Sequence, residues 1–417
     1  MVSIVIVGNG AAGNRAAEII RGYDPGAAIT MVAREESPEY SACALPDYLS
    51  GWISREQLFI KQWSDYRKSN INIISGVNVA RIDAGQKLLV TEQGDISYDR
   101  LILATGSRTF LPPVPGHDLP GNFAVKTVTD IDAIMAHRPQ RAVVVGSGNI
   151  GVEMAASLKV RGCQVTLVEM RGQILPRIFD PESAGRIRGM LTTHGIRVFT
   201  GEELMAVSGC DRVEKVSTSQ QVIACDTVVW AAGMKPEVEI ASQAGIEIGE
   251  LGAIKVDPFL QTNRPGIYAC GDCIEAVDML TGMPAQRMLW PNAKRQGEVA
   301  GLNCIGCQVA YEGAISLVTS EVFGVPVASM GLTAAALTGQ PVQVVEGECQ
   351  GSHWRLLLVD DRIMGMQAIG ITAGLGAVMA MMKNRVLITD FRKIVSDPEL
   401  AQRAAWYLPA GRFLNAG

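Results

Sequence analysis

The sequence has no cluster of lysine and arginine residues, and its formal net charge is −5 over 417 residues. Proteins that bind nucleic acid or anionic membrane surfaces use such clusters to hold phosphate groups. We therefore expect neither of these among the partners. The first apolar run also follows Met1 directly, without a basic leader or a small-residue cleavage site. Exported chains carry such a leader, so we expect a cytoplasmic protein.

The sequence also lacks a regular cysteine framework and has few histidines. Its nine cysteines are an odd number scattered over the chain, which indicates reduced thiols. One spacing, Cys270 and Cys273 followed by Cys304 and Cys307, is compatible with a zinc or iron-sulfur site. We predict no metal there, because cysteine packs well as a small hydrophobic residue. The histidines show no ligand spacing; they are His117, His137, His194 and His353.

Charged residues are absent from residues 363–382, a stretch long enough to cross a membrane. It contains four glycines, however, together with Gln367 and Thr372, and its strand-like first half passes into a helix-like second half. We expect a buried strand and helix rather than a membrane span. The helical part is apolar nearly all round, which predicts that another element or a different subunit covers it.

A dinucleotide-binding pattern is present at residues 3–13, SIVIVGNGAAG. A β-branched apolar run, glycines and a helix-compatible stretch predict a strand, a tight turn and a helix. Gly8 suits the turn, Gly10 admits a pyrophosphate and Gly13 lets helix and strand pack closely. The helix start then offers N–H groups to the phosphates. The alternative is a glycine-rich turn of some other α/β domain.

A second copy at residues 141–151, RAVVVGSGNIG, favours the dinucleotide interpretation. The following strand places Glu169 about twenty residues beyond the loop, where a carboxylate can accept a hydrogen bond from a ribose 2′-OH. For the first loop, the carboxylate should follow the strand expected at residues 28–33, and Glu35 is the candidate. Two such sites imply two cofactors.

Residues 40–47, YSACALPD, carry the candidate reactive thiol. Pro46 suits the first turn of a helix, so Cys43 is expected just before a helix N-terminus, where the dipole favours the thiolate. A thiolate there can attack a disulfide or contact a flavin. The alternative is a buried, inert cysteine. No second cysteine follows within several residues, which excludes a redox pair of neighbours.

Three further segments combine an apolar run with a short motif at its end. They are residues 98–107 with ATG at 104–106, residues 227–236 ending in AAGMKP, and residues 266–272 ending in CGD. An aspartate in the position of Asp272 can bind a ribityl or ribose hydroxyl. In order and spacing, these segments and the two glycine loops resemble the FAD-dependent pyridine nucleotide-disulphide oxidoreductases over nearly the whole chain.

The resemblance implies an α/β fold with two Rossmann-like dinucleotide-binding domains and a C-terminal α+β interface domain. The implied FAD-binding domain is discontinuous, 1–115 and 241–315, with an NAD(H)-binding domain at 116–240 and an interface domain at 316–417. It also implies that Glu153 lies near the nicotinamide and flavin. The cofactor-binding residues are predicted to be Gly8, Gly10, Ala11, Ala12, Gly13, Glu35, Ala104, Thr105, Gly106, Gly146, Gly148, Asn149, Ile150, Gly151, Glu169, Gly233, Gly271 and Asp272.

Within the family, the segment around Cys43 looks like the single-cysteine branch, which includes coenzyme A-disulfide reductases and NADH oxidases or peroxidases. Residues 388–411 depart from the tyrosine-bearing segment of the coenzyme A-disulfide reductases, and Tyr407 is the only tyrosine nearby.

Glu169 makes NADH the expected reductant, while Arg171 leaves NADPH open.

We therefore predict an FAD-dependent NAD(H) oxidoreductase that moves electrons between NADH and a small redox acceptor or an iron-sulfur protein. It would act as a homo-oligomer or as the flavin subunit of a larger complex, as in phenylglyoxylate dehydrogenase or tungsten aldehyde oxidoreductase. The alternative is a coenzyme A-disulfide or persulfide reductase, or an NADH oxidase or peroxidase, in which Cys43 is the redox thiol. A third possibility is a flavin-binding protein with a regulatory or structural role.

Overall fold

The computed structural model describes residues 2–349, 351–372 and 374–388. The described chain forms two compact units. The first consists of residues 2–48, 53–108 and 234–315, and the second of residues 49–52, 109–233 and 316–388. The division into three domains stays a prediction.

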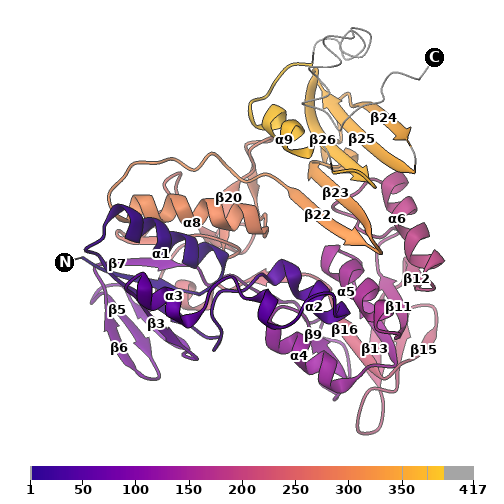
Figure 1. Ribbon diagram of the computed structural model, residues 1–417, viewed down its shortest axis with the longest axis horizontal. Helices are drawn as coiled ribbons and strands as arrows, with labels where there is room; N and C mark the ends of the chain where they lie inside the picture. The colour runs from indigo at the N-terminus through magenta and orange to yellow at the C-terminus, as the bar shows by residue number, and fades with distance from the viewer. Residues whose placement is uncertain (1, 350, 373, 389–417) are drawn as a thin grey trace. The chain divides into compact units, whose positions relative to one another are not determined.

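A five-stranded parallel sheet forms the centre of the first unit (Figure 1). Its order is β19-β7-β1-β2-β3, with β1 (Ser3–Val7), β2 (Ala28–Ala33), β3 (Ile71–Ser75), β7 (Arg100–Leu103) and β19 (Ile267–Ala269). The predicted strand at residues 28–33 is thus confirmed. The carboxyl ends of parallel strands share one edge of a sheet, so the loops after β1, β2, β7 and β19 meet there.

Two long helices of the first unit, α1 (Ala11–Tyr23) and α8 (Trp290–Cys304), lie side by side (Figure 1). Their close approach depends on small residues. A Cβ on Gly297 would collide with the backbone carbonyl of Ala12, and one on Gly301 would lie 2.9 Å from the carbonyl oxygen of Ala16. The Arg15 guanidinium also pairs with Glu298 at 3.0 Å. The two helices therefore pack almost backbone to backbone.

Smaller elements complete the first unit. An antiparallel sheet contains β4 (Val79–Asp83), β5 (Leu88–Thr91) and β6 (Gly94–Ser97). Short strands are β17 (Met234–Pro236), β18 (Ile254–Lys255), β20 (Ile274–Val277) and β21 (Pro284–Ala285), and short helices are α3 (Trp63–Lys68) and α7 (Glu239–Gln243). The helix α2 (Leu45–Ser50) and the strand β8 (Ser107–Thr109) begin in the first unit and end in the second.

The second unit repeats the parallel architecture. Its main sheet has the order β12-β11-β10-β16-β9, with β9 (Asn122–Ala124), β10 (Arg141–Val145), β11 (Gln164–Glu169), β12 (Arg197–Thr200) and β16 (Thr227–Trp230). Its helices include α4 (Val128–His137), α5 (Asn149–Val160) and α6 (Pro181–Thr193), and β13 (Leu204–Ser208), β14 (Lys215–Thr218) and β15 (Val222–Ala224) form an antiparallel sheet. Both units are therefore built on a doubly wound pattern.

The second unit also contains a C-terminal antiparallel sheet of order β22-β23-β26-β25-β24. Its strands are β22 (Leu317–Val322), β23 (Val325–Gly331), β24 (Gln343–Cys349), β25 (Ser352–Val359) and β26 (Arg362–Ile369), followed by α9 (Leu375–Lys383). The strand and helix predicted within residues 363–382 are confirmed. In the described residues, no helix has both the length and the apolar character needed to span a membrane.

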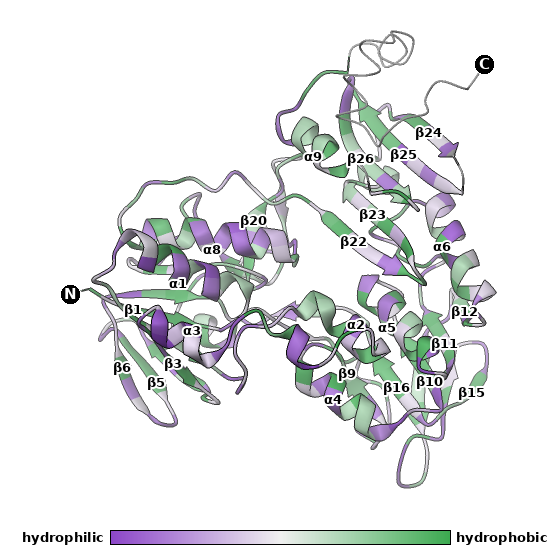
Figure 2. Cartoon of the chain, in the orientation of Figure 1, coloured by the Kyte–Doolittle hydropathy of each residue, from purple (hydrophilic) through white to green (hydrophobic). Residues whose placement is uncertain are grey.

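Helix α9 is as apolar as its sequence suggests, and Figure 2 colours it largely green. Only Val378 and Met382 of the helix are fully buried within the described residues. That another element or subunit covers the helix stays a prediction.

The C-terminal sheet is joined to the chain that follows β11 by buried polar contacts. The Asp180 N–H donates to the Gln367 side-chain oxygen at 3.0 Å, and the Asp180 carboxylate accepts the Ala334 N–H at 2.8 Å. The Ser329 hydroxyl donates to the Ile178 carbonyl. Residues 178–180 are thus held by hydrogen bonds to the C-terminal sheet.

The packing of α1 on α8 yields a stability prediction. Gly297→Ala should lower the free energy of unfolding by about 1–3 kcal/mol, because the new methyl group overlaps the Ala12 carbonyl. Denaturant unfolding followed by circular dichroism measures the change. Gly22→Ala is the control on α1, since a Cβ there meets nothing within 4 Å; equal losses in both variants would contradict the packing argument.

Candidate functional site

In the first glycine loop, two glycines are packed tightly against backbone and the third faces open space. Gly8 follows β1 with φ +116°, and a Cβ there would collide with the Ala104 carbonyl. A Cβ on Gly13 would collide with the Gly8 carbonyl, whereas one on Gly10 meets no protein atom within 4 Å. Gly8 and Gly13 are therefore explained by the fold itself. The space above Gly10 is what the close approach of a pyrophosphate requires.

The second loop shows the same division. A Cβ on Gly146 would collide with the Ala231 carbonyl, one on Gly151 would collide with the Gly146 carbonyl, and one on Gly148 meets nothing within 4 Å. In each loop the middle glycine is also the N-cap of the following helix, α1 or α5. The first N–H groups of each helix, those of Ala11 and Ala12 or of Asn149 and Ile150, lack partners within their own helix and are available to phosphate.

Glu169 lies at the end of β11, beside the second loop. One carboxylate oxygen accepts both the N–H and the hydroxyl of Ser147, each at 2.8 Å, and the other accepts the Arg171 N–H at 2.8 Å. The residue is only 7% exposed. A carboxylate offers about four acceptor positions, so the fixed group retains capacity for a ribose hydroxyl.

Glu153 lies one turn into α5, and its carboxylate accepts a hydrogen bond from the Asn149 amide at 2.9 Å. Gly233 follows β16 with φ +127°, and no protein atom lies within 4 Å of a Cβ built there. Both lie at the carboxyl-end side of the second parallel sheet, together with the loop between β10 and α5.

Around the first loop, the segments after β7 and β19 bring further predicted residues together. The Asp272 carboxylate accepts the Ser107 hydroxyl at 2.8 Å, and the Gly271 N–H donates to the Gln296 side chain at 2.9 Å. The Thr105 hydroxyl donates to the Glu237 carbonyl at 2.6 Å. Ala104 and Gly106 flank Thr105, so these predicted residues and the first glycine loop share one sheet edge.

Cys43 occupies a 3₁₀ turn, Ala42–Ala44, immediately before α2, as predicted. Its side chain is exposed and forms no disulfide. Glu35, two residues beyond β2, is half-buried and accepts the Tyr40 hydroxyl at 2.7 Å.

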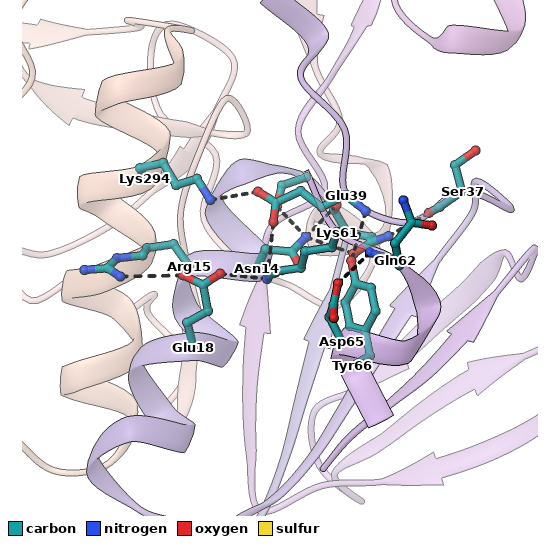
Figure 3. Close-up of polar contacts among 12 residues, drawn as sticks. Asn14, Arg15, Glu18, Ser37, Glu39, Lys61, Gln62, Asp65, Tyr66 and Lys294 are labelled. Atoms are coloured by element: carbon teal, nitrogen blue, oxygen red, sulfur yellow. Dashed lines mark hydrogen bonds and ion pairs between the residues drawn. The ribbon is translucent and has the colours of Figure 1, made fainter. Parts of the chain in front are cut away.

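The chain leading to Cys43 is anchored by a buried ionic network that was not predicted (Figure 3). The Glu39 side chain is fully buried, with Lys294 at 2.7 Å and Lys61 at 3.2 Å from its carboxylate oxygens. Nearby, the Ser41 N–H donates to the Leu58 carbonyl at 2.9 Å. These contacts fix the start of the Cys43 loop.

The four cysteines with the metal-like spacing, Cys270, Cys273, Cys304 and Cys307, are not placed like Cys43. Cys270, Cys273 and Cys304 are buried in the core of the first unit. Burial raises the pKa of Cys304 to about 12 and that of Cys270 well above its ordinary value, so both thiols stay protonated. The Cys273 thiol donates to the Cys270 carbonyl at 3.3 Å. Across the described part of the chain, no group of three or more His, Cys, Asp or Glu residues is arranged to hold a metal ion.

Residues 389–417, including Tyr407, lie outside the described residues. The predicted departure from the coenzyme A-disulfide reductases falls largely on this segment.

Residues 2–297 match the family model described as pyridine nucleotide-disulphide oxidoreductase. The chain belongs to this family. It is 33% identical over 429 aligned positions to an NADH oxidase of Methanocaldococcus jannaschii, covering 97% of this chain and 94% of the relative. It is 30% identical to a CoA-dependent NAD(P)H sulfur oxidoreductase of Pyrococcus abyssi, covering 88% of this chain and 87% of the relative.

Among solved structures, an NAD-dependent persulfide reductase from A. fulgidus superimposes with a TM-score of 0.88 at 27% identity, covering 95% of this chain and 79% of that chain. As a member of the pyridine nucleotide-disulphide oxidoreductase family, the chain is an oxidoreductase that uses FAD and NAD(H). The predicted α/β fold and family are thereby confirmed. The assignment of individual residues to each cofactor stays a proposal.

The two kinds of glycine in the first loop should respond differently to the same substitution. Gly10→Ala should fold normally but bind FAD about tenfold or more weakly, because its methyl group enters the space left for the pyrophosphate. Gly13→Ala should instead lower the melting temperature of the apoprotein. Thermal unfolding and flavin fluorescence titration separate the two effects; a Gly10→Ala variant with wild-type FAD affinity would refute the placement.

Proposed function

We propose that the chain is an NADH-dependent flavoprotein reductase in which Cys43 passes electrons to a small acceptor containing a disulfide or persulfide bond. The observation that supports this proposal most directly is that the Cys43 thiol is exposed, on a loop of the first unit whose start is anchored by the ion pair of Glu39 with Lys294. An attacking thiolate must be accessible to its substrate, and the start of α2 favours that charge state. The two sulfur-reducing relatives support the same assignment.

The proposed reaction is NADH + H⁺ + RSSR′ → NAD⁺ + RSH + R′SH. The Cys43 thiolate attacks one sulfur of RSSR′, the S–S bond breaks, and the departing R′S⁻ takes up a proton. A mixed disulfide of Cys43 with RS remains. FAD, when bound, carries the two electrons of the NADH hydride that cleave this second S–S bond. Cys43 returns to the thiolate and RS⁻ is protonated.

We assign the first glycine loop to FAD and the second to NADH. Glu169 supports NADH over NADPH, because its buried carboxylate accepts hydroxyl groups and repels a 2′-phosphate. Glu153 and Asn149 form a polar pair in the first turns of α5, in keeping with the expected place beside the nicotinamide. The proposed electron acceptor is therefore a small disulfide or persulfide. The competing hypothesis is that the acceptor is a protein.

Cys43→Ser should abolish NADH-driven disulfide and persulfide reduction while changing NADH–ferricyanide reduction by less than about twofold, since only the first reaction needs a nucleophilic sulfur. Steady-state assays with both acceptors measure the difference. Cys210→Ser is the control, because Cys210 is also exposed but belongs to the second unit. Full disulfide reductase activity in Cys43→Ser would overturn the proposal and redirect attention to a protein acceptor.

Glu169→Gln should raise the KM for NADH by about tenfold or more, the effect expected when a hydrogen bond to a charged group is lost. The KM for NADPH should change little or fall, because the carboxylate no longer repels its 2′-phosphate. Ferricyanide reduction at varied coenzyme concentration gives both constants. Parallel increases for the two coenzymes would show that Glu169 does not discriminate between them.

A further inference from the structure

The carbonyl group that precedes the middle glycine is held differently in the two glycine loops. The three glycines of each loop have the same spacing, so Asn9 corresponds to Ser147 and Asn14 to Val152. In the first loop, the Asn14 amide on α1 donates to the Asn9 carbonyl at 2.8 Å. Val152 on α5 has no donor group in its side chain and cannot hold the Ser147 carbonyl in this way. The second loop therefore needs support from another segment.

This support comes from the chain after β11. The Leu175 N–H donates to the Ser147 carbonyl at 2.8 Å. In a planar trans peptide, the carbonyl and the following N–H point in opposite directions, so the bond turns the Gly148 N–H away from Leu175. A Cβ on Gly148 would meet nothing within 4 Å. The bond from Leu175 thus orients the peptide that leads into the open space of the second loop.

Leu175 has a backbone conformation that only its surroundings can maintain. It is left-handed, with φ +50°, and the residue is 1% exposed. This conformation is unfavourable for a residue with a Cβ and persists where neighbouring contacts hold it. The Leu175 carbonyl accepts the Ile178 N–H at 2.9 Å and the Phe179 N–H at 3.0 Å, and the Gln173 amide donates to the Phe179 carbonyl at 2.9 Å. Residues 173–179 therefore form a closed turn that presents the Leu175 N–H to Ser147.

The C-terminal sheet holds the end of this turn. Ser329 on β23, Gln367 on β26 and Arg355 on β25 are paired in register and form one row across three neighbouring strands (Figure 1). Ser329 donates to the Ile178 carbonyl, Gln367 accepts the Asp180 N–H, and the Arg355 Nε lies 3.6 Å from the Asp180 carboxylate. Ser329 and Gln367 are 6% and 1% exposed. Because water does not reach these groups, losing either hydrogen bond leaves a buried polar group unpaired.

We propose that Ser329 and Gln367 of the C-terminal sheet are positioning residues for NADH. Through residues 175–180 they fix the Ser147 carbonyl, and with it the orientation in which the second loop meets the pyrophosphate of the coenzyme. The inference rests on the proposed function in assigning NADH to the second loop. It gives the C-terminal sheet a part in coenzyme binding besides the interface role expected from the sequence. Because Asn14 supports the first loop from its own helix, the sheet has no such part in FAD binding.

Ser329→Ala tests the inference, because it removes the hydrogen bond to Ile178 with little change in volume. The KM for NADH in ferricyanide reduction by the holoprotein should rise about three- to tenfold, as expected for one lost hydrogen bond. Both kcat and the dissociation constant of FAD should stay within about twofold. An unchanged KM would overturn the inference.

Ser320→Ala is the matched control. Val318 pairs with Ser329, so Ser320, two residues further along β22, lies on the same face of the sheet. Its hydroxyl is buried and has no hydrogen-bond partner among the described residues. The KM for NADH should therefore stay at the wild-type value in this variant. Equal increases in Ser320→Ala and Ser329→Ala would attribute the effect to packing of the sheet and overturn the positioning role.

Hydrogen exchange measured by mass spectrometry separates positioning from a general loss of stability. Ser329→Ala should speed amide exchange in residues 173–180 and 146–152 and leave residues 8–14 as in the wild type. Gln367→Leu, which removes the acceptor of the Asp180 N–H, should give the same pattern and a similar rise in the KM for NADH. Faster exchange in both glycine loops alike would contradict the inference.

Gly148→Ala separates failure of this inference from failure of the proposed function. Its methyl group enters the open space of the second loop, so the KM for NADH should rise about tenfold or more. A rise in Gly148→Ala without one in Ser329→Ala would overturn only the role of the C-terminal sheet, and no rise in either would overturn the coenzyme assignment as well. Failure of the Cys43 reaction would appear as wild-type protein that reduces ferricyanide with NADH but reduces no disulfide or persulfide.

Discussion

At each of the two glycine loops, backbone approaches backbone so closely that two positions of the loop can hold only glycine. In each loop a glycine after the central strand contacts the carbonyl of a neighbouring segment, and a glycine in the helix contacts the carbonyl of the first glycine. Side chains at these positions would push the helix away from the sheet. With glycine there, the first N–H groups of α1 and α5 are brought to the sheet edge, and an open space remains at Gly10 and Gly148.

Much of this could be predicted from local sequence. The strand–glycine–helix pattern depends on residues within one short segment, so both loops, the strand at residues 28–33 and the position of Cys43 before a helix were correctly predicted. The position of Glu169 beside the second loop was correctly predicted as well, because strand length and loop length fix its distance from that loop, whereas its role toward a ribose stays a prediction. The ordered motifs along the chain then identified the family.

Other features depend on contacts between residues far apart in sequence. No pattern connects Glu39 with Lys61 and Lys294, although they meet in one buried network (Figure 3). That Ala33 occupies the position equivalent to Glu169 also follows only from the strand register, which pairs Val7 with Val32 and Val145 with Val168. The hydrogen bond from the Asp180 N–H to Gln367, which joins the chain after β11 to the C-terminal sheet, likewise could not be predicted from the sequence.

The proposed reaction requires Cys43 to be a redox centre that exchanges electrons with the flavin. The most direct test is an anaerobic titration of the purified holoprotein with NADH, following flavin absorbance and counting equivalents per flavin. If Cys43 exchanges electrons with the flavin, a second equivalent is consumed or a long-wavelength thiolate-to-flavin charge-transfer band appears. Bleaching of the flavin by one equivalent, with no such band, would contradict it and leave Cys43 redox-silent.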